Sequence, residues 1–255
     1  MHYRHNFLTN VVLRLDFMPI PTLRNPANFA TKPEFSTRIA EKYPIAVSQP
    51  TATLSINLGP TASGMVPQIT GAQWFHRKVE NGAAVVVLAP EFAAIEYGKE
   101  IYDHFPVFRT EVTLVINALR ELYDIPIFTR IGLRYINEIV MPEGNPLDWK
   151  GLISSDLITA VKAGKQSGVD MVRSMHQLQI RKDECEMVFN YGLSNPDYPN
   201  ALARRVFILD FDGARTNVDV ANALTAIDDL NKFCESMFED SIDNDLRREM
   251  ESIND

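Results

Sequence analysis

The fold is decided by two short stretches, TNVVLR at residues 9–14 and TRIGLR at residues 129–134, which lie 120 residues apart. Each begins a run in which successive side chains fall on opposite faces, the period-two pattern of a β-strand. In the first run Leu13, Leu15 and Phe17 share one face, and Val12, Arg14 and Asp16 share the other. In the second run Leu133 and Tyr135 share one phase, and Arg134 falls in the other. The recurrence predicts one structural unit used twice, with halves 1–126 and 127–255.

The remaining elements follow the same order in both halves. In the first half, hydrophobic periodicity and turn residues predict strands at about 7–18, 51–58, 73–79 and 84–97, the last two joined at Asn81-Gly82, and helices at about 33–43 and from 106. In the second half they predict strands at about 127–141, 172–182, 185–193 and 204–212, and helices at about 154–165 and from 217. The predicted fold class is therefore α+β. An internally duplicated β-α-β-β-β-α unit forms a twisted, mainly antiparallel sheet with helices on one face, as one intimately packed pseudo-symmetric domain.

Composition narrows the functional classes. Acidic residues number 33 against 25 basic ones, which gives a formal charge of −8 and disfavours binding to a phosphate backbone. The opening MHYRHNF lacks the apolar core of a signal peptide, and no segment approaches the about 18 apolar residues that span a bilayer. We expect a cytoplasmic protein with no membrane association and no nucleic-acid partner.

Motifs for metals, cofactors and catalysis are missing or incomplete. The five histidines lack ligand spacing apart from His2 and His5, and Cys185 and Cys234 fit reduced, structural thiols. No nucleophile elbow, phosphate-binding loop or dinucleotide fingerprint occurs. The run VFILDFDG at 206–213 is similar to the D-x-D-G strand of haloacid-dehalogenase-type phosphatases, but only 43 residues follow Asp212. We therefore predict no metal site, no cofactor and no catalytic residue, and lean against an enzyme.

One face of the predicted sheet carries polar side chains. If the helices cover the leucine face, the other side presents Arg14, Asp16, Ser55, Asn57 and Arg134, to which Gln177, Gln179 and Arg181 add from the second half. Such a face can bind a peptide or a ligand. The alternative interpretation is that the arginines form ion pairs that tie neighbouring strands together.

Three further segments carry a family resemblance: RIGLRYIN at 130–137, the Asn195-Pro196 loop followed by FILD at 207–210, and FEDSI at 238–242 with Leu246. Over most of its length the chain resembles an uncharacterised, sporadically distributed bacterial family marked by R-x-G-L-R-Y-I-N and F-E-x-S-I. The resemblance implies an accessory role, such as phage defence or a toxin–antitoxin system. The residues that it marks are Arg134, Tyr135, Asn137, Glu239 and Ser241. These residues also fit a docking contact between the strand and the segment after the last helix, with Glu239 as partner of Arg134.

These observations favour a non-enzymatic interaction protein. Its partner is a protein encoded nearby, bound by the polar sheet face or by the charged terminal stretch 240–255. A ligand or nucleotide sensor, or an enzyme, stays open as the alternative, with Arg134, Tyr135 and Asn137 lining a pocket between the two halves. The sequence also leaves a homo-oligomer open.

Overall fold

The computed structural model describes residues 2–25, 28, 31–59, 62–79, 82–161 and 170–253; at residues 2, 52–59, 62–70, 252 and 253 it describes the backbone only. Its elements in chain order are β1 (His2–Tyr3), β2 (Leu8–Phe17), α1 (Pro21–Arg24), α2 (Glu34–Arg38), β3 (Ile45–Gly59), β4 (Ala62–Arg77), β5 (Ala84–Leu88), β6 (Phe92–Gly98), α3 (Phe105–Leu122), β7 (Ile127–Met141), β8 (Ser174–Lys182), β9 (Cys185–Leu193), β10 (Arg205–Asp219), the 3-10 helix η3 (Val220–Asn222), α4 (Ala223–Ser241), α5 (Asn244–Met250) and β11 (Ser252–Ile253).

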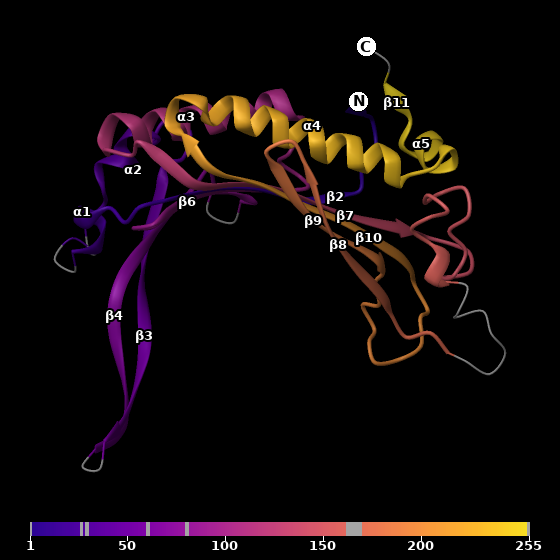
Figure 1. Cartoon of the computed structure of the whole chain (residues 1–255), viewed down its shortest axis with the longest axis horizontal. Coiled ribbons are helices and arrows are strands. Elements are labelled where there is room, and N and C mark those ends of the chain that lie inside the picture. The colour runs from indigo at the N-terminus through magenta and orange to yellow at the C-terminus, as the bar shows by residue number, and fades with distance from the viewer. Residues whose placement is uncertain are drawn as a thin grey trace. The chain divides into compact units, whose positions relative to one another are not determined.

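The chain has an α+β fold built on a mainly antiparallel sheet (Figure 1). Nine strands are hydrogen-bonded in the order β3-β4-β5-β6-β2-β7-β10-β9-β8, and β1 pairs separately with β11. The fold divides into two compact units. Unit 1 comprises residues 1–11, 132–215 and 225–255, and unit 2 comprises residues 12–131 and 216–224.

Unit 2 buries the leucine face of β2. Leu13, Leu15 and Phe17 are at most 4% exposed, as the alternation predicts. The apolar stripe of α3, which includes Val112, Val115, Ile116 and Leu119, is buried in the same unit. Helix α3 also contacts the sheet through Phe108, whose ring lies edge-on to Tyr97 of β6 at 5.2 Å.

In unit 1, α4 lies along one face of β7 and β10 (Figure 1). The Cys234 thiol donates to the carbonyl oxygen of Leu133, and a Cβ added to Gly213 would lie 3.3 Å from Leu230 Cδ2. Odd-numbered residues of β7 and β10 therefore face the helix. Burial raises the pKa of the Cys234 thiol to about 12, so this cysteine is a protonated core side chain.

The strand count of the first half differs from the prediction. Residues 84–97 form two antiparallel strands, β5 and β6, where the sequence predicts one. They turn at Pro90, which has no backbone N–H for a ladder, and the turn closes through a bond from Ala89 N to Phe92 O of 2.8 Å. Strand β4 also extends back to Ala62, into a segment predicted as a loop. Asn81 of the predicted Asn81-Gly82 turn lies outside the described residues.

The second half matches the predicted strands more closely. Strands β7 and β9 have the predicted bounds, and β8 and β10 overlap theirs. Of the helix expected over 154–165, the described part contains a 3-10 turn at 159–161, and residues 162–165 lie outside it. The order of elements therefore does not repeat strand for strand between the halves.

None of the helices in the described part of the chain combines the length and the hydrophobicity needed to cross a bilayer.

Candidate functional site

A row of polar side chains crosses four strands of unit 1. Arg134 on β7 donates to Asp210 on β10, with Nε–Oδ1 and Nη2–Oδ2 distances of 2.7 and 2.8 Å. Asn190 Nδ2 on β9 donates to Asp210 Oδ2 at 3.2 Å, and Gln177 Nε2 on β8 donates to Asn190 Oδ1 at 2.9 Å. We call these four residues the polar ladder. It lies on the side of the sheet opposite α4, because its residues alternate with those that face the helix.

Strand register explains the ladder. Asp210 lies directly opposite Asn190, and Asn190 lies directly opposite Gln177. Side chains at such paired positions are close enough to bond across strands. We call the sheet surface around the ladder, which includes Gln179 and Arg181, the polar face.

The ladder combines a buried carboxylate with a half-exposed cation. The Asp210 side chain is 8% exposed and that of Arg134 is 43% exposed. The hydrogen bonds of Asp210 raise the pKa of the Arg134 guanidinium, so the arginine is charged. Two of its donors are fixed on Asp210, and the exposed remainder of the guanidinium can bind a carboxylate, a carbonyl or a phosphate.

The other motif residues of β7 contact other elements of unit 1. Tyr135 donates its hydroxyl to Asn231 Oδ1 on α4 at 2.7 Å, and the buried Asn137 donates to the Leu209 carbonyl at 3.3 Å. The R-x-G-L-R-Y-I-N strand thus contacts β10 through two side chains and α4 through a third. These three contacts go to residues outside 238–242, the segment to which the docking interpretation assigns them.

Glu239 is not the partner of Arg134. It accepts a hydrogen bond from the Tyr3 hydroxyl at 2.8 Å and one from Arg247 Nε at 3.2 Å. Ser241 is buried, and its hydroxyl donates to the Met237 carbonyl at 2.6 Å. The F-E-x-S-I segment therefore secures the end of α4 to β1 and α5.

The candidates of the first half lie in unit 2. Arg14 donates to Asp16 Oδ1 on its own strand at 2.7 Å, and its guanidinium lies 3.9 Å from the centre of the Phe92 ring. The side chains of Ser55 and Asn57 lie outside the described residues. Arg14 and Arg134 therefore share a phase in the sequence, and each binds an aspartate, Arg14 on its own strand and Arg134 on the neighbouring β10.

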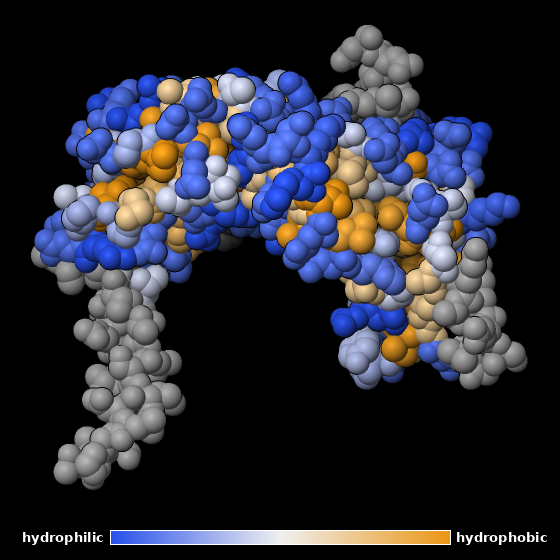
Figure 2. Space-filling model, in the orientation of Figure 1, coloured by the Kyte–Doolittle hydropathy of each residue, from blue (hydrophilic) through white to orange (hydrophobic). Residues whose placement is uncertain are grey.

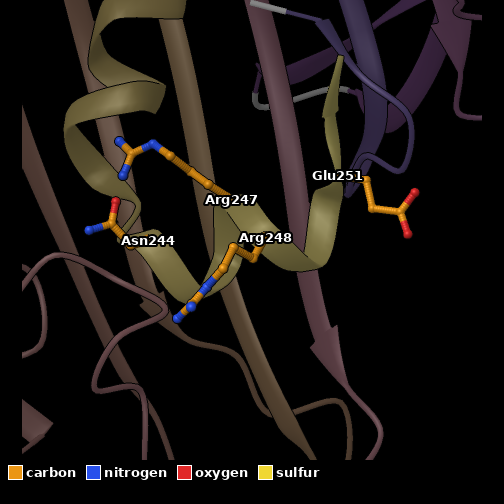
Figure 3. A pocket seen from close by; sticks show the side chains of 4 residues that line it. All are labelled: Asn244, Arg247, Arg248 and Glu251. Atoms are coloured by element: carbon orange, nitrogen blue, oxygen red, sulfur yellow. The ribbon is translucent and has the colours of Figure 1, made fainter. Parts of the chain in front are cut away.

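A shallow pocket lies beside α5 in unit 1, lined by Asn244, Arg247, Arg248 and Glu251 (Figure 3). Each of its charged side chains already has a partner of opposite charge. Arg247 binds Glu239, Arg248 binds Asp245, and Glu251 binds Arg4. These three ion pairs balance the charges of the side chains that line the pocket.

Unit 2 buries a serine and a histidine in contact. Ser36 Oγ lies 2.8 Å from His76 Nε2, and His76 Nδ1 lies 3.1 Å from the Val86 carbonyl oxygen. These residue types can act as nucleophile and base. His76 is 0% exposed and Ser36 is 6% exposed, so the pair lies inside the core.

Two ladder residues, Asn190 and Asp210, are missing from the sequence candidates. Asn190 alternates with the buried Met187 and Phe189 along β9, so its face could have been inferred. Asp210 stands out in the D-x-D-G run, but its pairing with Arg134 depends on the order of strands. No protein-family model, no curated protein and no solved structure matches this chain.

Proposed function

We propose that the chain is a non-enzymatic binding protein that docks a partner protein on the polar face of unit 1. The polar ladder supports this proposal best. Its members hold one another in place, so a partner that binds them loses little additional side-chain entropy. A fixed guanidinium and exposed amides offer donors and acceptors of the kind that give polar interfaces their specificity.

The family resemblance suggests the setting. We propose that the partner is a toxin or effector encoded beside this chain, in an accessory bacterial system of the phage-defence or toxin–antitoxin kind, and that both act in the cytoplasm. The negative net charge supports a protein partner over a nucleic acid.

A duplication stays part of this proposal. Strands β2 and β7 are neighbours in the strand order, and they carry Arg14 and Arg134 at the same phase. A second recurrence in the sequence relates Val86-Val87-Leu88 of β5 to Phe207-Ile208-Leu209 of β10. These two strands are not equivalently placed, because β6 separates β5 from β2 whereas β10 is next to β7. The first recurrence is therefore the better support.

The experiment is capture of the tagged chain from its native host with the neighbouring genes present, followed by mass spectrometry. We expect one neighbour in stoichiometric amount. The test variant, Gln177→Tyr, places bulk on the polar face, and the control, Leu178→Tyr, places the same bulk on the opposite face of β8. Both positions are exposed, so neither change perturbs the core.

Partner capture should be lost with Gln177→Tyr and kept with Leu178→Tyr. Recovery of no neighbour, or equal capture by both variants, would overturn the proposal. A thermal shift with a nucleotide panel then tests the sensor alternative, since a ligand at about one hundred times its Kd adds roughly 2.7 kcal/mol of stability.

A further inference from the structure

Strand β8 has an edge with backbone groups available for pairing. It is the last strand in the nine-strand order, and it pairs with β9 alone among the strands that the structure describes. Lys182 lies opposite Cys185 across a two-residue turn. In such a hairpin the residues flanking the turn exchange both backbone bonds, and alternate residues point their N–H and C=O outward. Met175, Gln177, Gln179 and Arg181 therefore present their backbone groups to the free edge.

The side chains of β8 are unusually exposed for a sheet strand. Met175 and Leu178 are each 42% exposed, on opposite faces of the strand. Figure 2 shows apolar side chains among polar ones over the region of the β8–β9 hairpin. An exposed, partly apolar edge is the feature to which extended segments of other proteins add as an extra strand.

A cation lies at each end of this edge, and Asp183 and Glu184 follow Lys182 in the turn. Arg173 lies over the Tyr198 ring at 5.4 Å, and Lys182 lies over the Phe233 ring at 6.0 Å. Within the described residues neither forms an ion pair, whereas Arg181 between them is paired with Glu186. No acidic residue occurs from 173 to 182. The two cations are nine positions apart, which corresponds to about 30 Å of extended chain.

We propose that β8 binds an extended segment of the partner protein by strand addition, and that this segment carries acidic residues near both ends and apolar residues between them. The proposal rests on the protein-binding function proposed above and names the chemistry of the partner. Backbone bonds to the outward groups of β8 supply the affinity, and Arg173 and Lys182 select the acidic ends.

A second copy of β8 is the competing occupant. Antiparallel pairing through the outward-facing residues, over the full length of the strand, places Gln177 opposite Gln179 and Lys182 of one copy opposite Ser174 of the other. This pairing supplies no carboxylate to Lys182, whereas an acidic segment does.

The test is selection of peptides of about twelve residues from a random phage-displayed library, a length that covers the strand and both cations. The purified full chain is the bait. Enriched peptides should carry Asp or Glu near both ends. Their binding is then measured by fluorescence anisotropy against Gln179→Pro, which removes one outward N–H, and against Gln179→Thr, which keeps it.

Binding to Gln179→Pro should be weaker by at least about tenfold, because one backbone hydrogen bond is lost and the adjacent ones are weakened. Binding to Gln179→Thr should be unchanged. Circular dichroism and thermal melting check the fold. If Gln179→Pro does not fold, Met175→Pro near the start of the strand takes its place, because proline is tolerated at strand starts and edges.

A charge exchange tests the selectivity. Lys182→Glu should weaken the binding of acidic peptides by about fivefold. It should strengthen the binding of a peptide in which the acidic residue at that end is replaced by lysine. Arg181→Gln removes a cation that is already paired with Glu186, so it should leave the binding of both peptides unchanged. A selection without enrichment, peptides without acidic ends, or full binding to Gln179→Pro would overturn strand addition.

The outcomes separate this proposal from the proposed function. If the captured neighbour still binds Gln179→Pro but not Gln177→Tyr, the partner docks on the polar face and strand addition is wrong. If neither a neighbour nor a peptide binds, both proposals fail. A concentration-dependent dimer that Gln179→Pro abolishes would identify a second copy as the occupant and overturn the acidic segment.

Discussion

Arg134 and Asp210 form a two-point ion pair between β7 and β10, 76 residues apart in the chain. The Asp210 carboxylate is almost entirely buried, whereas 43% of the Arg134 side chain is accessible. Loss of the arginine leaves the buried Asp210 charge with a side-chain hydrogen bond from Asn190, at 3.2 Å. Loss of the carboxylate leaves a cation that water can solvate. The two halves of this ion pair should therefore differ in the cost of removal.

We predict that Arg134→Met lowers the free energy of unfolding by about 3 kcal/mol, because it leaves the buried Asp210 carboxylate without its ionic partner. Asp210→Asn should cost about 1 kcal/mol, since the amide still accepts one hydrogen bond and the arginine is solvated. Urea denaturation measures both. Equal costs, or a larger cost for Asp210→Asn, would contradict this account.

A second buried carboxylate lies in unit 2. Glu111 on α3 accepts hydrogen bonds from Lys42 at 2.9 Å and Lys78 at 3.3 Å, and its Oε2 atom is buried without a partner among the described residues. Burial raises the pKa of Glu111, but the two lysines together lower it by more than burial raises it, so the net shift is downward. The carboxylate is therefore charged and depends on the lysines.

Glu111→Gln should lower the free energy of unfolding by about 2 kcal/mol, because the amide oxygen can accept both hydrogen bonds but no longer offers the lysines a negative charge. The matched control is Glu121→Gln on the same helix. Its bond to Arg38, at 3.3 Å, joins two exposed side chains, so we expect a change within about 0.5 kcal/mol. Thermal and urea melts compare the two. A control that costs as much as Glu111→Gln would show that burial does not set the difference.

Much of the strand pattern could be predicted from the sequence because one face of each strand is buried. Alternation in residues 9–17 and 127–141 identifies β2 and β7, since a buried face needs an apolar side chain at every second position. The long β4 could not be predicted, because Gly64, Pro67 and Gly71 disfavour strands on propensity alone. Pairing with the 15-residue β3 along most of its own 16 residues overrides that preference.

The candidate site could be predicted only in part. The alternation of side chains along a strand indicates the sheet face on which Arg134 and Gln177 lie. It does not indicate which strands are neighbours or in what register they pair. The partner of Arg134 follows from the pairing of β10 beside β7, a relationship of tertiary structure. Glu239 was the reasonable candidate from the motif, and Asp210 is the observed partner.

Gly192 permits the close approach of β8 and β9. Its φ of +143° disfavours other residues, and an added Cβ would lie 1.9 Å from the Ser174 carbonyl oxygen. We predict that Gly192→Ala costs at least about 2 kcal/mol and speeds amide exchange in β8, because the strands must separate at Ser174. Hydrogen–deuterium exchange reads the strand directly.

The control for this change is Gly213→Ala on β10. Its added Cβ would lie 3.3 Å from Leu230 Cδ2, the end of a side chain that can move. We expect a cost below about 1 kcal/mol and unchanged exchange in β8. Equal exchange rates in β8 for both variants would show that Gly192 is not required for this pairing.

His76 makes the stability of unit 2 depend on pH. The ring is fully buried, with Ser36 Oγ on Nε2 and the Val86 carbonyl on Nδ1. The carbonyl can only accept, so Nδ1 carries the proton and Nε2 accepts from the serine. Burial lowers the pKa of His76 from 6.5 to about 4, and the charge of Lys32 adds to this effect. Between these two pKa values the His76 ring is therefore neutral in the folded state and charged in the unfolded chain.

Between pH 6.5 and pH 4 the unfolded chain binds a proton at this position that the folded chain does not, so stability falls as the pH is lowered through this range. The full difference is about 3 kcal/mol. Thermal melting at a series of pH values measures the slope for the native chain and for His76→Gln, whose amide can keep both hydrogen bonds but does not titrate. We expect the variant to lose most of the slope. A slope that is the same in both proteins would mean that other groups cause the acid sensitivity and that His76 is not held neutral by the fold.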